Sequence, residues 1–107
     1  MAAAVFLLSL AANARILNVP AQYMTIQDAI SASFSGDTVL VADGVYTGAG
    51  NKDLNYSGRA IAVMSANGPE NCIIDMENSG RAVTFNSGET RQAVFKGFTI
   101  CRGDVGI

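Results

Sequence analysis

The chain has 107 residues, enough for one small domain, and half of them are hydrophobic while only 15% are charged, a balance typical of a folded protein. It contains no histidine, which excludes a Ser/His or Cys/His catalytic pair and a histidine metal site within this chain. A formal charge of −2 is not typical of a nucleic-acid-binding protein, which needs a concentrated basic face, so no nucleic-acid partner is expected.

The N-terminal segment carries a short apolar run. Residues 5–12 are too few to span a bilayer, and Ala12-Asn13-Ala14 fits the A-x-A pattern that signal peptidase cleaves. We therefore predict a signal peptide over residues 1–14 and a mature chain over residues 15–107. That chain would be secreted or at the cell surface, with no membrane span after cleavage. A terminal core helix or a truncated membrane anchor is the alternative.

A 22-residue repeat runs through the rest of the chain. A Ser-Gly pair recurs at this spacing, and apolar residues fall on two tracks with the same period: Leu17, Val39, Ile61, Val83 and Val105 on one, and Val19, Val41, Val63, Phe85 and Ile107 on the other. The apolar residues alternate within each segment, which predicts strands with one buried face. A strand every 22 residues is too close for a βαβ unit but fits a parallel solenoid. We therefore expect Ile61 and Val83 on neighbouring parallel strands.

One predicted helix interrupts the strands. Residues 25–34 place Ile26, Ala29 and Ile30 on one helical face, Thr25 is a good N-cap, and Asp28 occupies the third helical position. The first turn of a solenoid exposes an apolar end and an unpaired strand edge. We predict that this helix covers that end.

A coil of this length needs a second strand in each turn. Candidate second strands are residues 45–47, 72–75 and 94–100. The polar residues 48–57 are predicted as a loop, with residues 51–58 projecting from the second turn. The two cysteines, Cys72 and Cys101, are too few for a disulfide framework. We expect buried free thiols, although an exported chain would permit one bridge.

The segment VPAQYMTIQDAISASFSGDTVLVADGVYTG resembles the N-terminal part of right-handed parallel β-helix proteins of the pectin-lyase-like superfamily. The shared elements are Thr25-Ile26-Gln27, Gly36-Asp37 and Gly44-x-Tyr46, and residues 68–75 and 94–100 resemble later turns. The resemblance covers about residues 16–107 and implies an all-β fold, a right-handed parallel β-helix with an N-terminal capping α-helix. Members usually stack more turns, so the chain is expected to be the N-terminal piece of a longer protein. No cofactor is expected here, and calcium binding is left open for a longer parent.

Arg59 and Arg81 are the candidate substrate-binding residues. They are 22 residues apart, which predicts that they stack at about the 4.8 Å strand spacing. Like charges that close together favour an anion between them, so an acidic polysaccharide is the predicted partner. The alternative is that both side chains splay into solvent and interact with nearby acids.

Other polar side chains are predicted to have structural roles. Five acidic residues fall at corners or in loops, where Asp commonly serves turns: Asp37, Asp43, Asp53, Asp75 and Glu77. Tyr23, Tyr46 and Tyr56 are candidates for a sugar-stacking platform, with core packing as the alternative, and no catalytic or metal-binding residue is assigned.

The function predicted from the sequence is that of a non-catalytic, carbohydrate-associated N-terminal fragment of an exported β-helix protein. Two alternatives stay open: the beginning of a polysaccharide-active enzyme, such as a pectin or polysaccharide lyase or a pectinesterase, and a structural adhesin-like surface protein. Whether the parent is an enzyme is not decided by the sequence. Self-association is expected through the open C-terminal edge near Val105 and Ile107.

Overall fold

The computed structural model describes residues 14–103, which contain nine short strands and one helix. The expected strand positions at Val105 and Ile107 lie outside the described residues. The elements are, in chain order, β1 (Ile16–Val19), α2 (Ile26–Ala32), β2 (Thr38–Val41), β3 (Gly44–Tyr46), β4 (Leu54–Asn55), β5 (Ala62–Ser65), β6 (Cys72–Asp75), β7 (Val83–Thr84), β8 (Val94–Lys96) and β9 (Thr99–Cys101).

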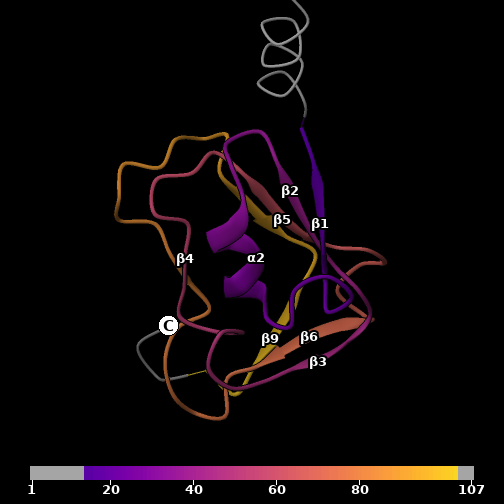
Figure 1. Cartoon of the computed structure of the whole chain (residues 1–107). Helices are drawn as coiled ribbons and strands as arrows, with labels where there is room; N and C mark the ends of the chain where they lie inside the picture. Colours follow the sequence, from indigo (N-terminus) through magenta and orange to yellow (C-terminus); the bar gives the residue numbers. More distant parts are fainter. Residues whose placement is uncertain (1–13, 104–107) are drawn as a thin grey trace, which may run out of the picture.

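The strands form three parallel sheets, with the orders β1-β2-β5-β8, β3-β6-β9 and β4-β7. From β2 onward the chain visits the three sheets in rotation, so that each strand pairs with one from the neighbouring turn (Figure 1). The result is a parallel β-solenoid of about three turns, which confirms the predicted all-β, coiled architecture.

The predicted constant turn length of 22 residues holds only for the first turn. Leu17 pairs with Val39, 22 positions on, but Val39 pairs with Val63 after 24 and Val63 with Phe95 after 32. Val83 lies on β7 beside Leu54, so the expectation that it neighbours Ile61 is wrong. The solenoid persists because strand pairing fixes the register of each sheet, while the connections between strands differ in length.

The recurring Ser-Gly pair explains why the spacing was misleading. Gly36, Gly58 and Gly80 all have positive φ, of 98°, 82° and 83°, the left-handed conformation that a sharp corner requires. The first two precede β2 and β5 of one sheet, whereas Gly80 precedes β7 of another. The Ser-Gly pair therefore marks a sharp corner of the chain but does not indicate to which sheet the next strand belongs.

Residues 48–57 differ from the predicted loop because they contain β4, the first strand of the third sheet. Leu54 and Tyr56 have none of their side-chain surface exposed, and both belong to the core. Two-residue strands are too short to show an alternating pattern. The expected segment 94–100 likewise divides into β8 and β9 on two sheets, with Gly97 at φ 86° between them. The other two candidate second strands are confirmed as β3 and β6, which pair with each other.

The core lies inside the coil and is built from columns of apolar side chains. Successive turns contribute Leu17, Val39 and Val63 to one column and Tyr46 and Ile74 to another, all of them buried. Burial of apolar area on this scale is the main favourable term for a small domain.

The cysteines are free, as expected, although only one of them is buried. Burial raises the pKa of the Cys72 thiol, with a further contribution from the Asp43 charge. Cys101, in contrast, is partly exposed beside Asp75 on the adjacent strand.

The helix α2 has the predicted position and cap. Thr25 is its N-cap, and the Thr25 hydroxyl accepts a hydrogen bond of 3.1 Å from Asp28 N. Ile26, Ala29 and Ile30 are fully buried, and the helix contacts β1, β2 and β4 (Figure 1). The helix thus covers the apolar interior at the first turn.

Gln27 gives this helix a second role as a substitute strand. Its carboxamide accepts a hydrogen bond from Asn55 N at 2.9 Å and donates one to Asn55 O at 3.1 Å. One side chain therefore makes both bonds that a neighbouring strand would make at this residue of β4. Backbone groups at a sheet edge that lack such partners would need water or another chain.

We predict that Gln27→Met lowers the free energy of unfolding by about 1–3 kcal/mol, because a side chain of similar shape would leave both Asn55 backbone groups without this partner. Urea unfolding monitored by circular dichroism measures the change. Gln92→Met, at an exposed loop position, is the matched control and should change stability by less than about 0.5 kcal/mol. Equal effects of the two substitutions would contradict this role of Gln27.

Candidate functional site

The two candidate arginines lie on different corners of the coil. Arg59 precedes β5 and Arg81 precedes β7, and these strands belong to different sheets. The premise that the two side chains stack one strand spacing apart is therefore wrong. The prediction fails because of the strand register. Val83 pairs with Leu54, which places Arg81 on the side of the coil formed by β4 and β7.

Arg59 is bound to main-chain carbonyl groups at the end of α2. Its guanidinium donates from Nε to Ser33 O at 3.0 Å and from Nη2 to Ser31 O at 3.3 Å. Nη1 donates to Tyr56 O at 3.2 Å. The last carbonyls of a helix carry partial negative charge and lack helical partners, which is why a cation stabilises this end. Most of the donor capacity of Arg59 is used inside the fold.

Arg81 is exposed, and its hydrogen bonds to other residues of the range 14–103 are made by its backbone. Asp53 Oδ1 accepts from Arg81 N at 2.8 Å, and Asp53 N donates to Arg81 O at 2.5 Å. These bonds hold the corner while the guanidinium faces solvent. A contact between Arg81 and an acidic ligand stays a prediction.

Carboxylates join neighbouring turns at the corners of the coil. Each of five acidic side chains binds a group that lies 22 to 31 residues away, one turn before or after: Asp37 with Arg15, Asp43 with Asn67, Asp53 with Arg81, Asp75 with Arg102, and Glu89 with Gly58. We call these contacts the corner latches. Four of the five corner and loop acids of the sequence prediction are among them; Glu77 is the exception, and its backbone N–H donates to Asp75.

Three of the corner latches, at Asp37, Asp75 and Glu89, favour the charged form of the acid. The hydrogen bond from Arg102 is the main reason that the pKa of Asp75 lies below its ordinary value. For Glu89 the main cause of a lowered pKa is the backbone N–H of Gly58, which lies 2.7 Å from Oε2. Carboxylates held ionised in this way are poor general acids near neutral pH.

Asp37 is the most deeply buried of these acids, with 3% of its surface exposed. Burial alone would raise its pKa, but hydrogen bonds from Phe34 N and Arg15 N and the Arg15 guanidinium outweigh this effect, so the pKa lies below its ordinary value. The distances are 2.8 Å from Phe34 N to Oδ2 and 2.9 Å from Arg15 N to Oδ1. The guanidinium Nη2 lies 3.0 Å from Oδ2.

Two of the three tyrosines are core residues and do not form a sugar platform. Tyr56 is fully buried and its hydroxyl donates to Val94 O, while Tyr46 is 8% exposed and donates to Ala42 O at 2.7 Å. Burial raises the pKa of both hydroxyl groups. Tyr23 is partly buried against the core.

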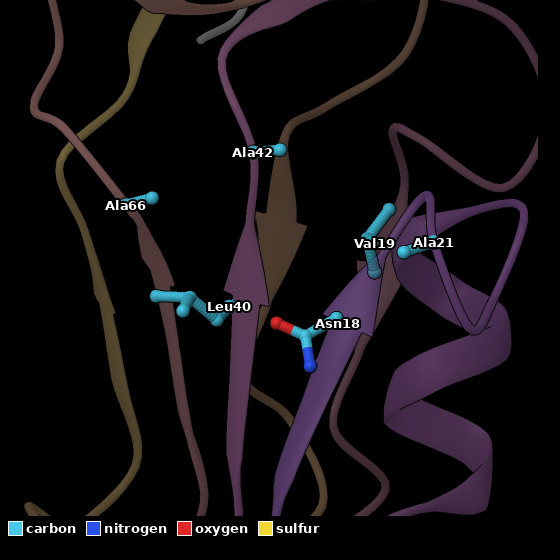
Figure 2. A pocket seen from close by; sticks show the side chains of 6 residues that line it. All are labelled: Asn18, Val19, Ala21, Leu40, Ala42 and Ala66. Carbon is cyan, nitrogen blue, oxygen red and sulfur yellow. The ribbon is translucent and has the colours of Figure 1, made fainter.

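A small cavity lies beside the outer face of the first sheet, near the start of the coil (Figure 2). Its volume is about 140 Å³ and its lining is mostly apolar: Asn18, Val19, Ala21, Leu40, Ala42 and Ala66. Small-molecule sites usually measure about 300–1,000 Å³ and carry converging polar groups. The Asn18 amide donates to Gln22 Oε1 at 3.0 Å, and none of the lining side chains is titratable. The cavity therefore suits at most a small apolar moiety.

Residues 14–103 contain no cluster of three or more Cys, Asp or Glu side chains arranged to hold a metal ion. In the same part of the chain, no helix has the length and hydropathy needed to cross a bilayer.

Several polar contacts were not predicted from the sequence. Lys52 Nζ donates to Met76 O at 3.0 Å and to Ser79 O and Oγ at 3.1 and 2.8 Å, which fixes the corner of the following turn. A lysine in a polar segment gives no signal of such a partner 24 residues away. For Arg15, the spacing of 22 residues from Asp37 matches the first turn and could have indicated the contact.

Comparison with known proteins found no matching family profile, no similar curated protein and no similar solved structure.

We predict that stability falls when the pH drops through the lowered pKa of Asp37. Its folded-state pKa lies below the ordinary value of 3.8, so the stabilisation is complete well above that value and disappears on acidification. Asp37→Asn should lower the free energy of unfolding at pH 7 by about 2 kcal/mol and flatten its acid dependence, as measured by urea unfolding between pH 7 and pH 2.5. Asp43→Asn, at an exposed latch, is the control, and an equal loss in both variants would contradict the prediction.

Proposed function

We propose that the chain is the N-terminal cap and first turns of an exported right-handed parallel β-helix protein of the pectin-lyase-like type. In this proposal it associates with carbohydrate at the cell surface or outside the cell and is not catalytic by itself. The observation that carries the proposal is the difference between its two ends. Helix α2 and Gln27 cover the start of the coil, whereas Phe85 and Ile100, near the other end, are 47% and 36% exposed.

The motif behind the resemblance has a physical role in this fold, which supports the proposal. Thr25 caps the helix, Ile26 enters the core and Gln27 pairs with β4. A Thr-Ile-Gln sequence therefore supplies a cap, a core contact and an edge partner in three consecutive residues.

The structural hydrogen bonds made by the acidic side chains support a non-catalytic role. Five carboxylates act as corner latches, and the cavity is lined without an ionisable group. Acid–base catalysis needs a positioned carboxyl group or base that is available to a substrate. In the parent protein, such groups would come from further turns.

Arg81 is the proposed contact for an acidic polysaccharide. Its exposed guanidinium is available to a uronate carboxylate, whereas the Arg59 guanidinium is bound to three carbonyl groups. A single exposed contact of this kind is weak and sensitive to salt.

The carbohydrate proposal predicts salt-sensitive retention of the chain on a polygalacturonate matrix, without release of unsaturated sugar products. Arg81→Ala should remove most of the retention, measured as the salt concentration needed for elution. Lys96→Ala removes the same charge from another exposed position and should have little effect. Absence of retention, or an equal loss in both variants, would count against Arg81 as the contact, and measurable turnover would overturn the non-catalytic role.

The exposed end of the coil is also proposed to bind a second copy of this chain. Among the described residues, β7, β8 and β9 are the outermost strands of their sheets, so each has one edge without a strand partner. Phe95 and Phe98 stack at 4.7 Å beside this end and are only partly buried. Apolar side chains next to open strand edges favour pairing between chains.

We expect the average molar mass in solution to rise with protein concentration, as measured by sedimentation equilibrium. Ile100→Lys should shift the dissociation constant upward by about tenfold or more, because it places a charge in the contact. Val45→Lys is the control, since Val45 is 63% exposed on the outer face of β3, in the same sheet. A monomer at all concentrations, or the same shift in both variants, would refute association through this end.

A further inference from the structure

The backbone nitrogen of Arg15 is bound directly to the buried carboxylate of Asp37. Arg15 N lies 2.9 Å from Asp37 Oδ1, and the Arg15 side chain reaches Oδ2 from Nη2 at 3.0 Å and from Nε at 3.3 Å. Asp37 is 3% exposed, whereas Ala14 and Arg15 are both exposed. One buried acid therefore binds the backbone and the side chain of the residue that follows the Ala12-Asn13-Ala14 motif.

We propose that hydrolysis of the Ala14–Arg15 peptide bond during export creates an α-ammonium group on Arg15 that forms an ion pair with Asp37, so that removal of the leader stabilises the cap. The inference rests on the proposed export of the chain. It adds a structural consequence of the cleavage after Ala14 that the sequence predicts, namely an ion pair between the new N-terminus and Asp37.

The chemical change at this bond is simple. A peptidase of the signal-peptidase class adds water to the Ala14 carbonyl, and the C–N bond breaks. Ala14 leaves with a new carboxylate, and the Arg15 nitrogen takes up protons to become an ammonium group. The hydrogen-bond donor to Asp37 changes from a neutral amide N–H to a cation at the same position.

The fold already holds this nitrogen in place. Arg15 O accepts a hydrogen bond from Thr38 N at 2.9 Å, which aligns Arg15 with the start of β2. Arg15 Nη2 also donates to Ala32 O at 3.0 Å, and the guanidinium lies 5.4 Å from the centre of the Phe34 ring. Because the main chain and the side chain are both fixed, the new charge needs no rearrangement to reach Asp37.

The local charges permit a second cation. Asp37 is the carboxylate at this point, and the Arg15 guanidinium is its partner, while α2 has no basic residue in its last turn. Arg59, from the corner before β5, binds Ser33 O nearby. The Arg15 ammonium would stay in contact with water because the residue is exposed, so its desolvation cost is small. Charge-assisted hydrogen bonds are roughly twice as strong as neutral ones.

The sign of the pH dependence follows from the partner. A carboxylate next to the α-amine raises the pKa of the amine in the folded state above its ordinary value of about 8. The added stability is therefore complete below pH 8 and is lost as the pH rises through the folded-state pKa. This loss of stability occurs at alkaline pH, whereas the loss predicted from the protonation of Asp37 occurs at acidic pH.

The first experiment expresses the full chain in a secreting bacterial host and determines the N-terminus of the exported product by mass spectrometry. We expect the product to begin at Arg15. A chain that keeps Met1 would overturn both the export proposal and this inference. A chain that is exported but cut at another bond would overturn this inference alone.

The second experiment compares the processed chain with the same material after selective acetylation of its α-amine, by urea unfolding at pH 6.5 and pH 10. We expect acetylation to reduce the ratio of folded to unfolded chain by about tenfold at pH 6.5 and to have little effect at pH 10. An equal stability of the two forms at pH 6.5 would refute the ion pair even if cleavage occurs after Ala14.

The role of Asp37 has a separate readout that does not depend on a stable variant. The rate of α-amine acetylation as a function of pH gives the pKa of the amine in the folded chain and in urea. We expect a higher pKa in the folded chain, and the same pKa in both states would contradict the inference. If Asp37→Asn folds, its amine should titrate at the same pH in both states, and Asp43→Asn should keep the difference.

Discussion

Each turn of this solenoid depends on backbone hydrogen bonds to the neighbouring turns, because adjacent strands of each parallel sheet come from successive turns. Within residues 14–103, β4 is the first strand of its sheet and has no strand on one side, so the backbone groups at that edge need partners of another kind. The side chain of Gln27 on α2 supplies them at Asn55, and Asn51 Oδ1 in turn accepts from Ile26 N at 3.1 Å. Helix and coil therefore satisfy one another's free backbone groups, and the hydrophobic columns can begin at a closed end.

The corners are the second level of organisation. Carboxylates and Lys52 bind across one turn to backbone or side-chain groups, and most of these contacts are exposed. Exposed ionic contacts are individually weak, but here they restrict corners whose residues already have the left-handed conformation, such as Asp53 and Ser57 at φ 52° and 53°. A chain with few charged residues thus uses many of them to define the path of its backbone. For the same reason they are poorly placed for chemistry.

The sequence predicted the elements whose signals are local. The alternating apolar residues gave the strands near Val39 and Val63, and the helical pattern gave α2 with Thr25 as its cap. The register beyond the first turn was not predictable, because a Ser-Gly corner occurs before strands of different sheets and short strands such as β4 carry no periodic signal. The stacking of Arg59 and Arg81 depended on that register and was lost with it. The bond between Arg15 and Asp37, at a spacing of 22 residues, lay within the range that the repeat described correctly.

The unequal lengths of successive coils have a consequence for how such a protein can change. Strand partners stay aligned although 24 residues separate Val39 from Val63 and 32 separate Val63 from Phe95, so the framework and its connections vary independently. Doubling the length of a flexible connection costs only about 0.6 kcal/mol in closure entropy. The segment between β7 and β8, where Arg91 and Gln92 are exposed, is therefore a suitable site for inserting foreign peptides. The same segment can also change during evolution without repacking of the interior.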